Sequence, residues 1–579
     1  MDAKTLIDRT FPTQTRAVAR RSLEPIAFAL LLLLGFILAF ERTGPLIRTN
    51  YIVLTNVETI ALLAIVTWLA ALAVAGRAPR FPKAIMLPGA AWLAILIGST
   101  LAAPAHQDKA LLFLGRVLAG ISICLVTYNL TRRDGRHIFL FTALASGACL
   151  VAFFGLAEGF GWTPAVVWLD GFKEAPTRVG DVLRVSATLS YATITAMVLE
   201  MILPLLIVLL LIAQRRAWQI VLAAGILVIL STHVLTLSRA GIISLLAALM
   251  LMALAGWWRG QRQLIFVSLL TAALLLALLA LVLGLNPMVR LRLTTETEQS
   301  WYQARYVAPD TIRARPGEVL TVPIAVTNSG ERIWSAGGEH FFALAYHLYD
   351  EYGESVTFDG ERTPLPSAVA PGESITLAGW IRAPQEPGNY RVEWDMVQEA
   401  VNWFSWEDAP TASSRLVVVA GQAQNAQELP SSRPPTDVRV TNPTPGRFDL
   451  WQAALQMALD HPLLGVGPDN FRWRYGDYAG LQAWDTGIHA NNLYLEMLAD
   501  TGMIGLLAFL WFSWRLAREG MWRLRNDQTD RSWLLGLGLV AGLATWYIHG
   551  FFDYFYEFTP TYMAFWLLVG LLTAVPARR

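Results

Sequence analysis

The feature that constrains this chain most is a series of apolar stretches, each close to 20 residues long. About 20 apolar residues form a helix that can cross the roughly 30 Å hydrocarbon core of a bilayer. Nine stretches precede a long polar region and three follow it, near 23–40, 52–75, 84–103, 110–130, 138–160, 186–213, 217–237, 240–258, 264–285, 490–513, 533–552 and 560–576. The sequence therefore predicts an all-α polytopic membrane protein with about twelve transmembrane helices, to within about one.

Composition agrees with a membrane protein and argues against several other classes. Of the 579 residues, 55% are hydrophobic and 15% charged, and a net charge of +1 gives no long-range field that would attract nucleic acid. Cys124 and Cys149 both lie in apolar stretches, so they cannot crosslink an external domain or form a multi-cysteine metal site. The eight histidines follow no metal-binding pattern, and no phosphate-binding glycine motif precedes a suitable helix. We expect no metal, no cofactor and no nucleic-acid partner.

Lysine and arginine are distributed unevenly between alternate loops, and cytoplasmic loops are the ones enriched in them. One set of loops, together with both termini, holds 22 of these residues. The opposite short loops hold only Arg42, Arg48, Lys109, Lys173, Arg178, Arg184 and Arg239. We therefore predict a multi-pass protein of the cytoplasmic (inner) membrane, with cytoplasmic termini and an extracytoplasmic loop over 286–489. The run 23–40 has no convincing cleavage site after it, which favours an uncleaved first span.

Within the long loop, apolar residues alternate with period two between turn signals, as in half-buried strands. The alternating residues are Leu320, Val322, Ile324 and Val326; Phe342, Leu344, Tyr346 and Leu348; Ile375, Leu377 and Ile381; Tyr390, Val392, Trp394 and Met396; Leu416 and Val418. This spacing predicts an antiparallel β-sandwich over about 302–421, similar to immunoglobulin-like modules. The predicted domains are helices 1–9 in 1–300, the sandwich in 301–421, a linker and interfacial loop in 422–489, and helices 10–12 in 490–579.

Arg239 interrupts a run of 41 nearly continuous apolar residues at 217–257. This run is twice the length that one span needs, so the chain must turn back near its middle. Counting the spans places the turn at the extracytoplasmic face, where an arginine between apolar helices is unfavourable unless it serves a cavity or a partner. The alternative is an arginine that extends its head group to lipid phosphates.

His489 lies where an aromatic, glycine-rich stretch at 447–505 enters the tenth span, on the predicted face of Arg239. The helix expected over 448–460 has an amphipathic pattern suited to the membrane interface. A positioned histidine is the usual general base near neutral pH. The alternative is an interfacial histidine beside a helix cap formed by Asn491 or Asn492.

Three further ionisable residues are weaker candidates for a direct role. His549 and Glu58 lie within predicted spans, where such groups are rare and often functional. His461 precedes a proline in a turn, which indicates a role in shaping the loop.

Three sequence blocks carry a resemblance to a known family. They are RVSATLSYATITAMVLEMILPL from Arg184, LTLSRAG around Arg239, and a block from Arg447 through DHPLLGVGPDNF to HANNLYLEMLADTGMIGLL. In their order and spacing these blocks resemble the O-antigen ligase family of polytopic glycan transferases, which is sometimes grouped with the O-antigen polymerases. The resemblance covers most of the membrane part and excludes the sandwich, which the family commonly lacks.

The resemblance implies transfer of a glycan from an undecaprenyl diphosphate carrier to a glycan, lipid or protein acceptor on the outer face of the bilayer. A diphosphate leaving group needs cationic donors, and the planar fork of arginine suits phosphate oxygens. Arg239 and Arg447 are then the expected diphosphate-binding residues, with Arg184 as a third. His489, which matches the family's histidine, is the expected general base of a metal-independent reaction.

Other roles and functions stay open at this point. Asp469 and Asn470, in the GVGPDNF turn, line the sugar site or only cap the turn. A polymerase that joins lipid-linked repeat units would use similar groups, and a transporter or flippase is the alternative of another class, although no internal repeat is visible. The sandwich could bind glycan, recruit an acceptor or act as a spacer. Trp334, Trp403 and Trp406 could stack on sugars, although aromatic residues of a sandwich are more often core.

Overall fold

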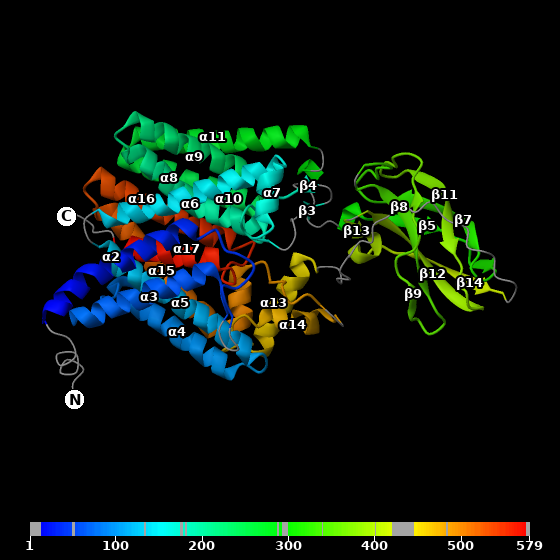
Figure 1. The fold of residues 1–579 in the computed structure, drawn as a ribbon, viewed down its shortest axis with the longest axis horizontal. Helices are drawn as coiled ribbons and strands as arrows, with labels where there is room; N and C mark the ends of the chain where they lie inside the picture. Colours follow the sequence, from blue (N-terminus) through cyan, green and yellow to red (C-terminus); the bar gives the residue numbers. More distant parts are fainter. Residues whose placement is uncertain are drawn as a thin grey trace.

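In the computed structural model the helices lie before and after one β-rich segment, and two short two-stranded ribbons fall among the helices (Figure 1). The structure describes residues 13–48, 53–132, 135–173, 178–179, 182–286, 289–291, 299–338, 340–399, 401–419, 445–481 and 484–574. The first part of the predicted linker and interfacial loop, residues 422–444, lies outside these residues.

Ten of the described helices are long and apolar enough to cross a membrane. They are α3 (Asn56–Ala75), α4 (Lys83–Ala102), α5 (Gln107–Thr131), α6 (Arg136–Gly159), α8 (Ala192–Ile212), α9 (Arg216–Leu235), α10 (Arg239–Arg259), α11 (Arg262–Leu285), α15 (Leu493–Asn526) and α16 (Asp530–His549). The other two predicted spans correspond to α2 (Thr13–Ile37) and α17 (Thr559–Ala574), whose apolar helical segments are shorter. A mostly helical architecture with ten candidate membrane spans among the described helices is confirmed, and a count of twelve spans stays a prediction.

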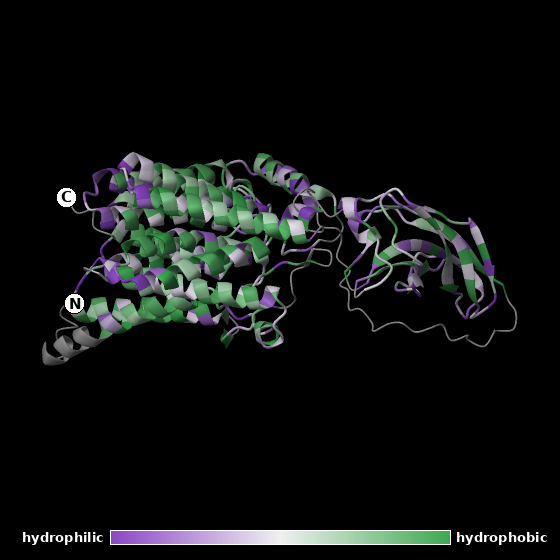
Figure 2. Cartoon of the chain, turned by 90° about the horizontal axis from the view of Figure 1, so that it is seen from above, coloured by the Kyte–Doolittle hydropathy of each residue, from purple (hydrophilic) through white to green (hydrophobic). Residues whose placement is uncertain are grey.

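Burial differs strongly among the candidate spans. In α8, 89% of the most apolar window is buried inside the protein, against 17% in α11. Apolar residues run along the bundle and hydrophilic residues gather at its ends (Figure 2). Gly542 lets α16 approach α8 closely, because a Cβ there would lie 2.3 Å from the carbonyl oxygen of Met201. α8 is therefore a central helix, and the polar groups that it carries are held by its neighbours.

A kink in α15 shapes the region that follows the β-rich domain. Gly502 interrupts the helix with φ 66° and ψ −174°, a conformation that only glycine adopts readily. The loop before α14 packs into this kink, and the backbone N–H groups of Val466 and Gly467 donate to the carbonyl oxygens of Ala499 and Asp500, each at 2.9 Å. The glycines of the third sequence block therefore allow a loop and a helix to meet backbone to backbone.

Two shorter helices lie at the end of the bundle nearest the β-rich domain (Figure 1). They are α13 (Arg447–Asp460), which corresponds to the expected amphipathic helix, and α14 (Phe471–Ala479). α7 (Thr163–Leu169) and the two-stranded ribbons β1–β2 (Ile47–Arg48, Val53–Leu54) and β3–β4 (Arg178–Val179, Val182–Leu183) connect membrane helices. α13 and the residue that follows β4 supply lining residues to a cavity at this end of the bundle.

The β-rich domain contains two sheets that share a core. The larger has the order β10 (Thr363–Pro364), β8 (Phe342–Tyr349), β12 (Gly388–Gln398), β14 (Ala412–Val418) and β6 (Thr311–Ala314), with β9 (Ser355–Thr357) on β8 and β13 (Asn402–Trp403) on β12. The smaller has the order β11 (Ser374–Arg382), β7 (Val319–Asn328) and β5 (Ala304–Val307). Ile324 of the smaller sheet and Trp394 of the larger both lie in the buried core.

The five alternating runs fall on β7, β8, β11, β12 and β14, so the β-rich region is confirmed. The pairings among these five strands are antiparallel, as predicted, whereas the additional short strand β6 pairs with β14 in parallel. Alternation indicates which face a side chain occupies, but it gives no information on the direction of the partner strand. The immunoglobulin-like fold stays a prediction. Trp334 and Trp403 are buried and Trp406 is partly buried beside Trp403, which favours the core interpretation of these aromatic residues.

Candidate active site at the end of the helical bundle

A cavity of about 290 Å³ lies where the ends of several membrane helices meet α13. It brings together Arg184, Arg239, Arg447 and His489, which come from three separate sequence blocks. We call this space the arginine cavity. Asp553 is the one carboxylate among the described residues that line it, so its lining carries more cationic than anionic groups. The cavity is suited to an anionic ligand.

Arg239 is the first residue of α10, directly after the turn from α9. Ser238 caps the helix by accepting a hydrogen bond from the N–H of Gly241 at 3.1 Å. Leu237, which also lines the cavity, has a φ of 53°, a strained conformation for a residue with a Cβ. The turn predicted from the doubled apolar run is therefore present, and it directs the start of α10 at the cavity.

Arg184 is held against the same turn. Its Nε donates to the carbonyl oxygen of Thr236 at 3.0 Å, and the N–H of Val185 donates to that of Leu235 at 3.1 Å. These contacts join the first sequence block to the second.

Arg447 enters the cavity as the first residue of α13. The helix start is fixed by the N–H of Gly446, which donates to Asp449 at 3.1 Å. Trp451 on the same helix donates from Nε1 to the carbonyl oxygen of Ala490 at 3.0 Å. This bond ties α13 to the segment that carries His489.

His489 is buried, with 6% of its surface exposed, and both of its ring nitrogens are paired with carboxylates. Nδ1 contacts Oε1 of Glu496, and Nε2 lies 2.6 Å from Oε2 of Glu557. Burial lowers the pKa of His489, but the two carboxylates outweigh it and raise that pKa well above its ordinary value. In this arrangement the imidazole is a cation, so it must release a proton before it can act as the expected base.

Glu557 is one of the two carboxylates that pair with the His489 imidazole. Burial raises the pKa of Glu557, but the hydrogen bond and charge of His489, together with the charge of Arg472, lower it to about 2. Arg472 Nη1 lies 3.2 Å from Glu557 Oε1. Glu557 could not be selected from the sequence, because it follows His489 by 68 residues and only the folded chain brings the two together.

Asp469 and Asn470 are buried and do not line the arginine cavity. Asp469 forms a two-point ion pair with Arg472, at 2.9 and 3.0 Å. Asn470 donates from Nδ2 to the carbonyl oxygens of Ala105 and Val466, at 2.8 and 2.9 Å. This geometry fits the turn-capping alternative, and a contact with sugar stays a prediction.

The two asparagines after His489 have different roles. Asn492 caps α15, since its Oδ1 accepts from the N–H groups of Tyr494 and Leu495 at 3.0 Å. Asn491 lines the cavity with a φ of 48°. The cap expected beside His489 is therefore formed by Asn492.

A second histidine lines the cavity at the end of α16. His549 is fully buried, and its Nδ1 contacts the carboxylate of Glu200, which also accepts from the hydroxyl of Ser244. Within the described part of the chain, no group hydrogen-bonds Nε2 of His549. Glu200 lies inside the first sequence block and within the predicted span 186–213, so the rarity of ionisable groups in spans is a signal that could have selected it.

A second cavity of about 630 Å³ adjoins the site. Its lining includes Glu41, Glu58, Arg116, Glu557 and Phe558. Phe558 also lines the arginine cavity, and Glu557 hydrogen-bonds His489 of that cavity. The His489–Glu557 pair therefore lies between the two spaces. The described residues contain no group of three or more His, Cys, Asp or Glu placed to hold a metal ion.

Comparison with known proteins gives one informative match. Residues 400–510 match the family model described as O-Antigen ligase, a range that contains Arg447, Asp469, Asn470 and His489. No curated protein matches the chain. A solved structure of the Pseudomonas fluorescens alkylpurine DNA glycosylase AlkC, bound to DNA containing an abasic site analog, aligns at 10% identity over 58% of this chain and 98% of that chain. Its TM-score is 0.14, so this likeness carries no argument.

The family match confirms the resemblance to O-antigen ligases over the third sequence block. With the candidate spans, it fits a membrane protein and points to a glycosyltransferase-like enzyme of O-antigen ligase or polymerase type.

Proposed function

We propose that this protein is a glycan ligase that transfers a saccharide from an undecaprenyl diphosphate carrier to an acceptor hydroxyl at the extracytoplasmic face of the membrane. The observation that supports it most is the meeting of Arg184, Arg239, Arg447 and His489 in one cavity at the helix ends. The match to the O-antigen ligase family covers the block that supplies two of these residues.

The arginines bind the diphosphate of the donor in this proposal. When the bond between the anomeric carbon and the diphosphate oxygen breaks, negative charge develops on that oxygen, and guanidinium groups already in place stabilise it. Arg239 begins an apolar helix that meets the criteria for a membrane span. A diphosphate bound beside Arg239 lies at the end of this helix, so the polyprenyl chain attached to the diphosphate stays in the bilayer.

The acceptor hydroxyl approaches His489 from the second cavity, which Glu557 lines. His489 first gives its Nε2 proton to Glu557 along their hydrogen bond, and the hydroxyl then takes the place of the protonated carboxyl group at Nε2. The neutral imidazole, held at Nδ1 by Glu496, then takes the hydroxyl proton as the acceptor oxygen bonds to the anomeric carbon. Direct displacement of this kind inverts the configuration of the anomeric carbon.

A reconstituted transfer assay tests the proposal. We expect His489→Ala to lower the transfer rate on the order of 10²–10⁴-fold, the usual contribution of a positioned acid–base group. Arg239→Ala is expected to lower it by a similar order, because the diphosphate loses a charged donor. Arg216→Ala, an exposed cation at the far end of α9, is the matched control and should transfer normally. Unchanged transfer in both site variants would contradict the mechanism.

A polymerase that joins lipid-linked repeat units is the nearest alternative, and the family description covers such proteins at a coarse level. Product length separates the two functions. A ligase attaches a preformed glycan in one step, whereas a polymerase gives a ladder that lengthens with time. A transporter or flippase would move the lipid-linked glycan across vesicles without forming a covalent product.

A further inference from the structure

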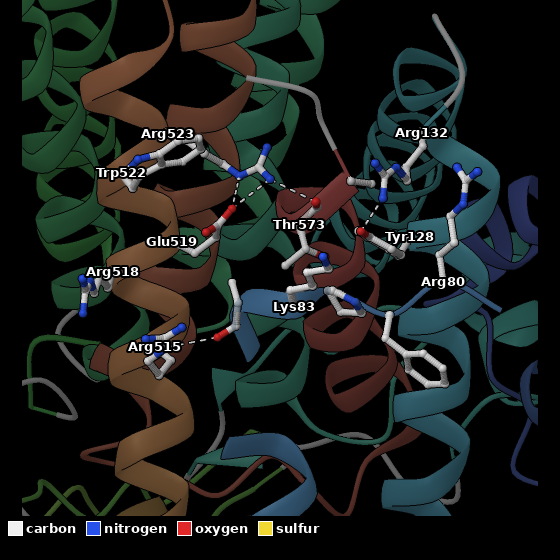
Figure 3. Close-up of a pocket in the computed structure, with 14 residues that line it drawn as sticks. Arg80, Lys83, Tyr128, Arg132, Arg515, Arg518, Glu519, Trp522, Arg523 and Thr573 are labelled. Atoms are coloured by element: carbon white, nitrogen blue, oxygen red, sulfur yellow. Dashed lines mark hydrogen bonds and ion pairs between the residues drawn. The ribbon is translucent and has the colours of Figure 1, made fainter. Parts of the chain in front are cut away.

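Figure 3 shows a second basic site, which is lined by the later part of α15, whereas the arginine cavity is lined by residues just before the start of that helix. This second site is a pocket of about 810 Å³ between the ends of α4, α5, α15 and α17. Six cations line it, namely Arg80, Lys83, Arg132, Arg515, Arg518 and Arg523. We propose that this basic pocket binds the phosphate head group of an anionic membrane lipid.

The single carboxylate among the described lining residues is already neutralised. Glu519 pairs with Arg523, with 2.9 Å between Oε1 and Nη2, and Arg523 also donates to the carbonyl oxygen of Thr573 at 3.0 Å (Figure 3). Arg523 is buried, so this pair forms the fixed floor of the pocket. The other five cations have no carboxylate within the lining to balance them.

Hydrogen bonds fix the segments that carry the cations of the pocket. The loop that carries Arg80 is fixed to α5, because Asn129 accepts from the N–H of Arg80 at 3.0 Å and donates to its carbonyl oxygen at 2.8 Å. Arg515 of α15 donates from Nε to the carbonyl oxygen of Ala84 in α4 at 3.1 Å. Arg132 contacts the hydroxyl of Tyr128 one helical turn earlier (Figure 3). The guanidinium groups of Arg515 and Arg132 are therefore partly ordered before an anion binds, which lowers the entropy cost of binding.

The surroundings favour a lipid over a free ion. Phe81 and Trp522 line the pocket with 46% and 47% of their surfaces exposed, and Trp514 and Leu87 are exposed nearby on the helices that form it. Aromatic residues at the ends of membrane helices lie at the depth of lipid head groups. Basic pockets between membrane helices suit phosphate head groups, whose acyl chains then lie along the apolar helix surface.

This pocket is distinct from the proposed donor site. The first of its α15 residues, Arg515, comes 22 residues after Leu493, the first residue of that helix, which corresponds to roughly 33 Å counted along the helix. On the orientation predicted from lysine and arginine, the pocket faces the cytoplasm and the arginine cavity faces the other side.

Lipid retention by paired charge variants tests the proposal. Arg132→Gln with Arg518→Gln removes two exposed cations of the pocket, and Arg525→Gln with Arg531→Gln removes two exposed cations of the same end that do not line it. Each full-length protein is incorporated into nanodiscs of phosphatidylcholine and phosphatidylglycerol and extracted, and the lipid that stays bound is measured by mass spectrometry. We expect the pocket variant to bind phosphatidylglycerol on the order of tenfold more weakly than the wild type and the control variant.

A second measurement separates lipid from free phosphate. Phosphatidylglycerol is expected to raise the unfolding temperature of the wild type and of the control variant, and to raise that of the pocket variant less. Equal losses in both double variants would overturn the proposal, since they would indicate only a charged surface. Stabilisation by inorganic phosphate that matches that of the lipid would also overturn it. Arg518→Gln alone, at an exposed position, repeats the comparison if the double variant folds poorly.

Discussion

The two basic cavities at the ends of the helical bundle differ in what accompanies their arginines. The arginine cavity combines its cations with two histidines, each paired with a buried glutamate, and with strained backbone at Leu237 and Asn491. The basic pocket has more cations, no histidine in its lining, and no described lining residue with a positive φ. Positive charge alone is enough to hold a phosphate. Proton transfer needs ionisable groups whose surroundings shift their pKa values in different directions. The comparison indicates chemistry at one end and binding at the other.

The largest expected effect concerns the carboxylate behind His489. Glu496→Gln is expected to lower glycan transfer on the order of 10³-fold, because Nδ1 of His489 loses the carboxylate that orients the ring and stabilises its protonated form. The measurement is the rate of transfer against pH. Glu496→Asp should restore part of the activity. A purely structural role would leave the shape of the pH profile unchanged.

The next largest expected effect concerns the guanidinium group of Arg239 at the proposed donor site. Arg239→Lys keeps the charge and removes the paired donors, so we expect transfer to fall about 10-fold to 100-fold. The same change at Arg518, in the basic pocket, should leave transfer within about twofold. Equal losses at both positions would remove the functional distinction between the two cavities.

A third prediction uses the stability of the His489–Glu557 pair against pH. The folded pKa of Glu557 lies near 2, below its ordinary 4.5, so its contribution is present above pH 4.5 and is lost as the pH falls towards 2. His489 has a raised pKa, so its contribution is complete below 6.5 and is lost only as the pH rises through the raised value. Glu557→Gln should therefore lower the unfolding temperature at pH 6, and the difference from wild type should shrink below pH 4.5. A constant difference would indicate that the pair contributes no ionic stabilisation.

The smallest expected effect concerns the cations of the basic pocket. Arg132→Gln with Arg518→Gln should change the transfer rate by less than about twofold in detergent, where the assay contains the donor and no anionic phospholipid. The assay that measures Glu496→Gln also measures this variant. A loss on the order of 10²-fold would show that the basic pocket takes part in catalysis.

Much of the architecture could be predicted because hydropathy and charge act along the chain. The doubled apolar run required a turn near Arg239, and the structure has α9 ending at Leu235 and α10 beginning at Arg239. The amphipathic pattern at 448–460 likewise predicted α13 to within one residue. Arg184, Arg239, Arg447 and His489 were selected from motif blocks, and the structure places all four in one cavity, although their roles stay predictions.

The partners of these residues could not be predicted, because they are set by contacts between distant segments. His489 lies against Glu557, 68 residues away, and His549 against Glu200, 349 residues away, and no local pattern links either pair. The parallel pairing of β6 with β14 was missed for the same reason. The uneven distribution of arginine predicted where positive charge would gather, but only the packing of four helices turned that charge into a pocket.

Glu557 belongs to both spaces of the proposed active site, since its side chain lines the second cavity and hydrogen-bonds the histidine of the first. A molecule that displaces this carboxylate on one side alters the charge balance on the other. Occupancy of the two spaces is therefore thermodynamically linked, and the linkage is reciprocal. Saturating one substrate should shift the apparent affinity for the other, and the sign of that shift reports whether the enzyme holds its donor more tightly before or after the acceptor arrives.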